Sequence, residues 1–155
     1  MKILVFSDTH HSTDECIDII QNTPDVCAVI HAGDMVSDAE DMSCIFSEIP
    51  FYYVSGNNDI VSSAPMQRLI GVANKKIFIT HGHGFGVKQA TARLVSYAKG
   101  LGASIVVFGH THRCCDKLEN GIYLLNPGSM GYYPRTYATI DIVNDEIYTK
   151  IINYN

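Results

Sequence analysis

Five apolar runs along the chain each end abruptly in small and polar residues. The runs span residues 1–6, 26–30, 51–54, 76–80 and 104–108. Apolar runs of this length, bounded by small and polar residues, are typical of buried strands of the parallel type. Sheets of this kind present their ligands at the carboxyl ends of the strands. The repeated pattern therefore predicts a functional site assembled from several strand ends.

Helical and hairpin patterns fill the intervals between these runs. We expect helices from residue 12 or 13 to Asn22, over residues 38–46, and from Val87 to Leu101. Residues 68–73 and 76–80 have the pattern of a hairpin joined across Asn74-Lys75. From about Cys114 the pattern is mostly β, with strands near 117–118 and over 122–125, 137–142 and 147–152. The chain is therefore predicted to be an α/β protein.

Composition places the chain among ordinary globular proteins. Its 155 residues are 46% hydrophobic and 17% charged, which predicts a single domain over residues 1–155. No apolar stretch approaches the ~20 residues of a membrane span, and the single lysine before the first strand argues against a signal peptide. Five cysteines without a C-x-x-C pair indicate reduced thiols and a cytoplasmic location. The net charge of −5 argues against binding to long nucleic acid.

Metal-capable side chains follow each of the five runs. Residues i and i+2 of an extended segment point the same way, so Asp8 and His10 are expected to converge. The full set is Asp8, His10, Asp34, Asn57, His81, His110 and His112. Oxygen and nitrogen ligands from five segments suit two transition-metal ions with open positions for water and substrate. Gly33, Gly56 and Gly109 precede three of these positions, where backbone must turn sharply or approach the ions.

Taken together, these motifs resemble the calcineurin-like metallophosphoesterases. The series is Asp8-x-His10, Gly33-Asp34, Gly56-Asn57-x-Asp59, His81 and Gly109-His110-x-His112. The short chain, His81-Gly82-His83 and Asn126-Pro127-Gly128-Ser129 are most similar to the small bacterial and archaeal phosphodiesterase branch. The resemblance runs from Met1 to about Ser129. It implies two mixed β-sheets packed face to face and flanked by helices, an α/β/β/α four-layer sandwich.

The resemblance also implies an assignment of ligands to two ions. The first ion would take Asp8, His10, Asp34 and His112, and the second would take Asp34 as a bridge with Asn57, His81 and His110. Manganese is the metal we expect, although such ligands also accept nickel, iron, cobalt or zinc. The ions and two aspartates leave the site at about +2, which attracts a phosphate oxyanion. A hydroxide bridging the ions would attack phosphorus in line, without a protein nucleophile.

Three residues outside the ligand set are candidates for contact with substrate. Asn58 stands where many relatives that hydrolyse monoesters have a histidine, and an amide has no proton to give at neutral pH. His83 follows a ligand by two residues, so it can contact substrate, act as an acid or be structural. Arg135 can bind phosphate through two parallel hydrogen bonds or form a surface ion pair. Neighbouring Tyr132 and Tyr133 can line a leaving-group pocket or a subunit interface.

Other polar residues near the motifs have structural interpretations. Asp59 is expected to orient a ligand, His31 to be a core histidine with satisfied hydrogen bonds, and His11 to face solvent. Residues 126–129 are expected to form a turn that closes over the ligand loops, with a phosphate cradle as the alternative.

Two classes of function are compatible with this sequence. The first is a metal-dependent phosphodiesterase that acts on small or activated diesters. The second is a non-catalytic scaffold, because the same fold also serves as a protein-binding subunit in membrane-coat machinery. A scaffold needs no complete ligand set, and here no ligand position is missing. Action on nucleic acid ends is a third reading, which the acidic balance disfavours. We therefore expect a small phosphate-ester substrate, no membrane partner, and either a monomer or a homo-oligomer such as a dimer or tetramer.

Overall fold

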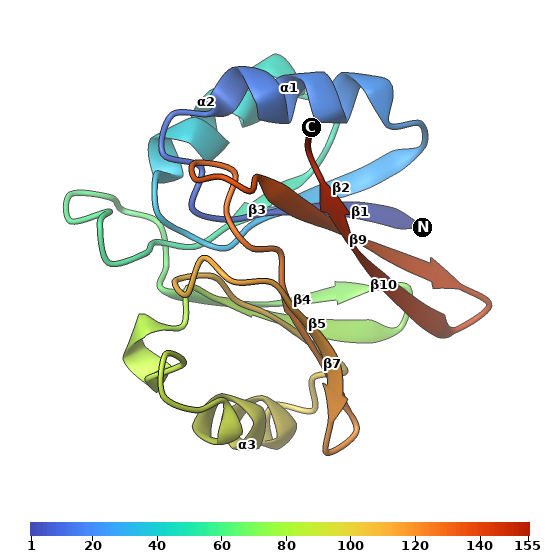
Figure 1. Cartoon of the computed structure of the whole chain (residues 1–155). Helices are drawn as coiled ribbons and strands as arrows, with labels where there is room; N and C mark the ends of the chain where they lie inside the picture. Colours follow the sequence, from blue (N-terminus) through green and yellow to red (C-terminus); the bar gives the residue numbers. More distant parts are fainter.

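The computed structural model describes all 155 residues and contains two five-stranded sheets and three helices (Figure 1). The strands are β1 (Lys2–Phe6), β2 (Val26–His31), β3 (Phe51–Tyr53), β4 (Gln67–Val72), β5 (Lys75–Thr80), β6 (Ile105–Val107), β7 (Cys115–Glu119), β8 (Ile122–Asn126), β9 (Thr136–Val143) and β10 (Glu146–Asn153). The helices are α1 (Thr13–Asn22), α2 (Val36–Ile45) and α3 (Ala92–Gly100), with a 3₁₀ turn η1 (His83–Phe85). None of the helices is long and apolar enough to cross a membrane.

Both sheets mix parallel and antiparallel pairs, as the sequence predicted. The first sheet has the strand order β10-β9-β1-β2-β3, and the second has the order β4-β5-β6-β8-β7. Strands β1, β2 and β3 are parallel to one another, and so are β5, β6 and β8. Hairpins occupy the edges of the sheets, where β9 pairs with β10 and β4 pairs with β5.

Alternate residues of the central strands face different layers of the molecule. Ile3 and Val5 of β1 pack with Ile77 and Ile79 of β5 in the core between the sheets. Leu4 and the neighbouring Phe6 face α1 and α2, where they meet Ile19 and Met42 among others. On the other side, Phe78, Val106 and Leu124 pack against α3. The period-2 alternation of these strands thus produces the α/β/β/α sandwich, and this prediction is confirmed.

Two local predictions were wrong. The hairpin turn lies at Ala73-Asn74, both in the left-handed region, so β5 begins at Lys75, one residue before the predicted start. The third helix begins at Ala92, not at Val87. Gly86 adopts a left-handed conformation (φ 68°), and η1 and turns occupy the interval before α3. Val87 still packs in the core beneath α3, which is why its position fits the helical period.

The parallel strands of both sheets bring the metal-capable residues to one end of the sandwich. Asp8 and His10 follow β1, Asp34 follows β2, and Asn57 follows β3. From the second sheet, His81 follows β5, while His110 and His112 follow β6. Hydrogen bonds cross between the two groups of loops, from the His110 amide to the Asp8 carboxylate and from a His81 ring nitrogen to the Ala32 carbonyl.

Candidate metal centre

Asp8 lies at the centre of the strand ends and is fully buried. Its Oδ2 accepts hydrogen bonds from the Ser7 hydroxyl at 2.5 Å and from the His110 amide at 3.1 Å. Its Oδ1 is buried without a hydrogen-bond partner and lies 3.1 Å from Nε2 of His112. Because an unpartnered buried carboxylate oxygen is costly, this atom is suited to a bound cation.

His10 and His112 complete the first group of ligand atoms. Their ring nitrogens and a carboxylate oxygen of Asp8 all lie within 4.8 Å of one another. Nε2 of His10 is buried without a hydrogen-bond partner, like Oδ1 of Asp8. The Tyr132 ring stacks on His112 with centroids 4.9 Å apart and contacts the edge of His10 at 5.0 Å. One aromatic ring therefore fixes the planes of both imidazoles.

Asp8, Asp34 and His81 form the second group, and all three are buried. Nδ1 of His81 donates to the Ala32 carbonyl at 2.8 Å, which leaves Nε2 facing the carboxylates, 3.4 Å from Oδ1 of Asp34. Burial lowers the pKa of His81, but Asp34 and Asp8 raise it above its usual value overall. A divalent cation would replace the proton that these two carboxylates hold on the ring.

Asn57, Asn58 and His110 border this second group. Oδ1 of Asn57 lies 3.1 Å from Nε2 of His81, and the His110 and His81 rings are 5.1 Å apart. Asn58 donates its backbone amide and its side-chain amide to the two oxygens of Asp34, at 3.0 and 2.6 Å. Burial raises the pKa of Asp34, but hydrogen bonds from His81 and Asn58 bring it well below its usual value. Asp34 is therefore ionised, as a metal ligand must be.

The structure brings the seven predicted ligands together. Asp8 belongs to both groups of close ligand atoms, whereas the family resemblance assigns the bridging role to Asp34. The donor set fits divalent cations, because two buried carboxylates, one with an unpartnered oxygen, lie among imidazole nitrogens. The division of ligands between two ions stays a prediction.

The backbone at this site is held in an uncommon conformation. Five of the seven predicted ligands have positive φ angles, namely Asp8 (51°), His10 (43°), Asp34 (59°), His110 (68°) and His112 (55°). Residues other than glycine rarely adopt this region of backbone conformation. Strain of about 1 kcal/mol or more per residue persists only where surrounding contacts impose it. The concentration of such residues here is typical of a functional site.

Gly56 and Gly109 allow the ligand loops to pack on one another. A Cβ atom at Gly56 would overlap Oδ1 of Asp34, and one at Gly109 would overlap the Ser7 hydroxyl and crowd Oδ2 of Asp8. The sequence suggested that these glycines let backbone approach the ions or turn sharply. The structure shows that they let one ligand loop approach the carboxylate of another.

A layer of hydrogen bonds holds the ligand loops in place. The Asp59 carboxylate accepts from four backbone amides, those of Asp34, Met35, Val36 and Gly56. Asn126 donates to the Gly109 carbonyl, and Ser129 donates to the Asp8 carbonyl at 2.8 Å. Asp59 thus orients the Asp34 loop, and residues 126–129 close over the loops that carry Asp8 and His110, as we expected.

A buried relay that the sequence did not reveal lies beneath Asp8. His31 accepts the Gly33 amide at Nδ1, so its Nε2 donates to Thr9, whose hydroxyl donates to Asp38 at 2.6 Å. Burial lowers the pKa of His31 to about 4, which agrees with a neutral core histidine. Asp38 also accepts from the backbone amide of the exposed His11. The only sequence signal was the polar neighbourhood of Asp8, because the partners lie 22 and 29 residues away.

His83 and Arg135 take different positions relative to the site. The His83 ring lies 5.6 Å from that of His81 and 6.1 Å from that of His110, and its Nδ1 is buried without a partner. Burial is the largest cause of the lowered pKa of His83. The Arg135 guanidinium forms an ion pair with Glu15 of α1, so in this state the structure shows the ion-pair alternative.

Fold and site together define the class of protein, an α/β sandwich with carboxylates and imidazoles clustered at its strand ends. The chain belongs to the calcineurin-like phosphoesterase superfamily, because the model of that family's domain matches residues 1–145. The resemblance read from the motifs is therefore confirmed.

Bacterial and archaeal proteins are among the relatives with similar sequences. The probable metallophosphoesterase YsnB of Bacillus subtilis is 32% identical over 151 residues, which cover 94% of this chain and 86% of YsnB. Phosphodiesterase MJ0936 of Methanocaldococcus jannaschii is 28% identical over 164 residues, covering 94% of each protein.

Solved structures show the same fold. A predicted phosphoesterase from Streptococcus pneumoniae TIGR4 superposes with a TM-score of 0.83 at 27% identity, covering 98% of this chain and 88% of that one. Vps29 from Entamoeba histolytica superposes with a TM-score of 0.75 over the full length of both chains, at 22% identity. The second likeness shows the fold alone.

The buried His31 predicts how the free energy of unfolding changes with pH. Its pKa is about 4 in the folded chain and 6.5 in an unperturbed histidine, so between pH 4 and 6.5 only the unfolded chain binds the proton. This contribution is fully present above pH 6.5 and is lost as pH falls toward 4, by roughly 3 kcal/mol. Urea denaturation of the wild type and of His31→Gln at several pH values measures it. The difference in free energy of unfolding between the two proteins should change between pH 4 and 6.5. Parallel pH profiles would refute the assignment of His31 as a neutral, buried histidine.

Proposed function

We propose that residues 1–155 form one domain that hydrolyses small phosphodiesters with the help of two divalent metal ions. The observation that carries this proposal is the pair of buried, unpartnered atoms, Oδ1 of Asp8 and Nε2 of His10, among further carboxylates and imidazoles. Such atoms persist in a folded protein where a ligand satisfies them. The family to which the chain belongs supports phosphoester hydrolysis.

Seven side chains would hold the ions. Asp8, His10, Asp34 and His112 would bind the first, and Asp34, Asn57, His81 and His110 would bind the second. Four imidazoles favour manganese or a similar transition metal over magnesium. When bound, the ions supply an activated water molecule as nucleophile and positive charge for the phosphate oxygens.

The remaining residues of the site position substrate and ligands. Asn58 presents an amide beside Asp34, where it can donate to a phosphate oxygen but cannot protonate a leaving group. His83 is close to His110 and its pKa is lowered, so it is suited to orienting a substrate oxygen as a neutral imidazole. Arg135 would have to break its ion pair with Glu15 to contact substrate. We therefore assign it a smaller part in substrate binding than Asn58 and His83.

The preference of the enzyme for diesters follows from the side chain of Asn58, which has neither an acidic proton nor a positive charge. A monoester dianion gains most from an additional positive imidazolium, and a poor leaving group gains most from a general acid. Neither is available at position 58. Phosphodiesters with acidic leaving groups, such as aryl esters, make the smallest demand on these missing groups. The phosphodiesterase name of the archaeal relative agrees with this preference.

A protein-binding scaffold is the second candidate, supported by the Vps29 neighbours, which are named for vacuolar protein sorting. The full set of ligands in this chain favours the enzyme.

For location and assembly, the five free thiols agree with a reducing cytoplasm. The 92% exposure of Tyr133 leaves a surface that a second copy could cover in a homo-oligomer.

Substitution at Asp34 should separate a metal ligand from a residue that only orients one. Asp34→Asn should lose tight Mn²⁺ binding and turnover, since a neutral amide cannot replace the charge of a bridging carboxylate. Asp59→Asn should retain both ions with affinity about 10- to 100-fold weaker. Calorimetric titration with Mn²⁺ and hydrolysis of an aryl diester measure the two effects. Equal losses in the two variants, with metal retained, would exclude Asp34 as the bridge.

Restoring a histidine at position 58 should change the substrate preference. In Asn58→His, kcat/KM for an aryl monoester should rise relative to that for the matching diester, because the imidazole adds an acid and positive charge worth ~10²–10⁴-fold. Asn22→His adds the same side chain at an exposed position at the end of α1, before the amino end of β2 and so opposite the strand ends that carry the site, and serves as control. A wild type that prefers the monoester, or an unchanged ratio in Asn58→His, would show that position 58 does not set the preference.

A further inference from the structure

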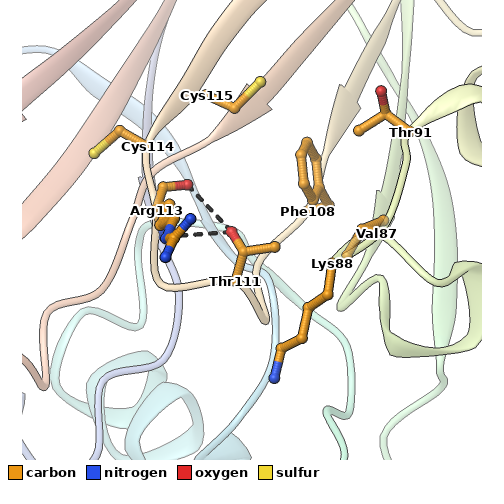
Figure 2. A pocket seen from close by; sticks show the side chains of 8 residues that line it. All are labelled: Val87, Lys88, Thr91, Phe108, Thr111, Arg113, Cys114 and Cys115. Atoms are coloured by element: carbon orange, nitrogen blue, oxygen red, sulfur yellow. Dashed lines mark hydrogen bonds between the residues drawn. The ribbon is translucent and has the colours of Figure 1, made fainter.

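A pocket of about 420 Å³ lies between the segment that follows η1 and the segment that follows β6 (Figure 2). One wall is formed by Val87 and Lys88, which follow η1, and the other by Phe108, Thr111 and Arg113, which belong to the segment after β6. Both segments also carry predicted site residues. Thr111 stands between His110 and His112, and Val87 packs so close to Gly82 that a Cβ there would clash with it. The pocket is therefore an extension of the site.

The pocket combines an apolar base with two free cations. Phe108 and Val87 are buried, while Lys88 and Arg113 are exposed. Figure 2 shows Arg113 and Lys88 on either side of Thr111, with the Lys88 side chain extending away from Cys115. Neither cation forms a salt bridge with a carboxylate, and Arg68, Lys76, Arg93, Lys99 and Lys150 also form none. In a chain of net charge −5, two unpaired cations in one pocket are suited to an anionic ligand.

The wall that carries Arg113 is preorganised. The Thr111 hydroxyl accepts the Arg113 amide and donates to the Arg113 carbonyl, both at 3.3 Å. Asn126 donates to the same hydroxyl at 3.1 Å and to the Gly109 carbonyl at 2.9 Å. These bonds tie the Arg113 backbone to the loop that bears the predicted ligands His110 and His112, so an anion bound at Arg113 would lie at a fixed place relative to the metal centre.

We propose that this pocket binds one ester arm of the substrate, and that Lys88 and Arg113 select arms that carry a carboxylate or a second phosphate. The inference rests on the proposed phosphodiesterase function and narrows its substrate class. A volume of about 420 Å³ suits one small organic group. The substrates selected are thus small diesters with at least one further negative charge. The net negative charge of the whole protein would by itself repel such anions.

A symmetric pair of diesters tests the selection, because either arm can then occupy the pocket. Bis(3-carboxyphenyl) phosphate and diphenyl phosphate have leaving phenols of similar acidity and differ in the carboxylates. The wild type should have the higher kcat/KM for the dicarboxylate. Lys88→Met and Arg113→Gln should each reduce the ratio of the two kcat/KM values about fivefold, and the double variant about 25-fold. Lys150→Met on β10 removes the same charge from the other sheet and should leave the ratio unchanged.

A binding measurement separates failure of the pocket from failure of the proposed function. Calorimetry on the Mn²⁺-loaded protein compares 3-phosphonobenzoate with phenylphosphonate, neither of which is hydrolysed. In the double variant, the affinity for 3-phosphonobenzoate should fall much more than the affinity for phenylphosphonate. If diphenyl phosphate is hydrolysed but the ratio is the same in all variants, the pocket assignment is wrong and the function stands. If neither diester is hydrolysed but 3-phosphonobenzoate binding depends on the two cations, the pocket stands and the function is wrong. Equal weakening of both phosphonates would overturn the pocket assignment.

Discussion

The buried carboxylate of Asp8 is the point at which the two sheets of this protein are joined at their functional end. One of its oxygens accepts from Ser7 beside it and from the His110 amide of the opposite sheet. Its backbone carbonyl accepts from Ser129 and from the Gly131 amide. Three segments far apart in sequence therefore meet at one residue, and the other oxygen is left without a hydrogen-bond partner. The loop that carries the predicted ligand His110 is fixed by this convergence.

This convergence requires an uncommon backbone. Parallel strands deliver their ends to the same edge, but the loops must then turn back within a few residues to aim side chains at one point. Left-handed φ angles at Asp8, Asp34 and His110 achieve this. Gly56 and Gly109 have no side chain, so the neighbouring loops can pack closely against them. The energetic cost is carried by the surrounding hydrogen bonds, such as the four that Asp59 accepts. The site is thus preorganised by the chain itself.

The strand ends and the ligand residues could be predicted because they are local in sequence. Each apolar run is contiguous, and Asp8, Asp34 and His81 stand one to four residues after the end of such a run. The start of α3 could not be predicted, because Val87 keeps the helical period although residues 86–89 form turns and the helix begins only at Ala92. The relay from His31 through Thr9 to Asp38 was also missed, since it joins residues that only the fold brings together. The same reason applies to the pairing of Arg135 with Glu15.

Charge is distributed unevenly between the surface and the site. The chain is acidic overall, yet its unpartnered acceptors are directed into the centre, and the unpaired cations Lys88 and Arg113 line the adjoining pocket. With cations bound at the carboxylates, centre and pocket would form one continuous positive surface within a negative protein. Such an arrangement discriminates small anions from large polyanions, which would also meet the acidic exterior.

The stoichiometry of metal binding tests the central claim most directly, namely that these seven ligands hold two ions. The protein would be stripped with a chelator and titrated with Mn²⁺, while electron paramagnetic resonance follows the bound ions and hydrolysis of an aryl diester is assayed in parallel. We predict two Mn²⁺ per chain with magnetic coupling between them, and activity that Mn²⁺ restores more readily than Mg²⁺. Binding of a single uncoupled ion, or full activity with Mg²⁺ alone, would contradict the account.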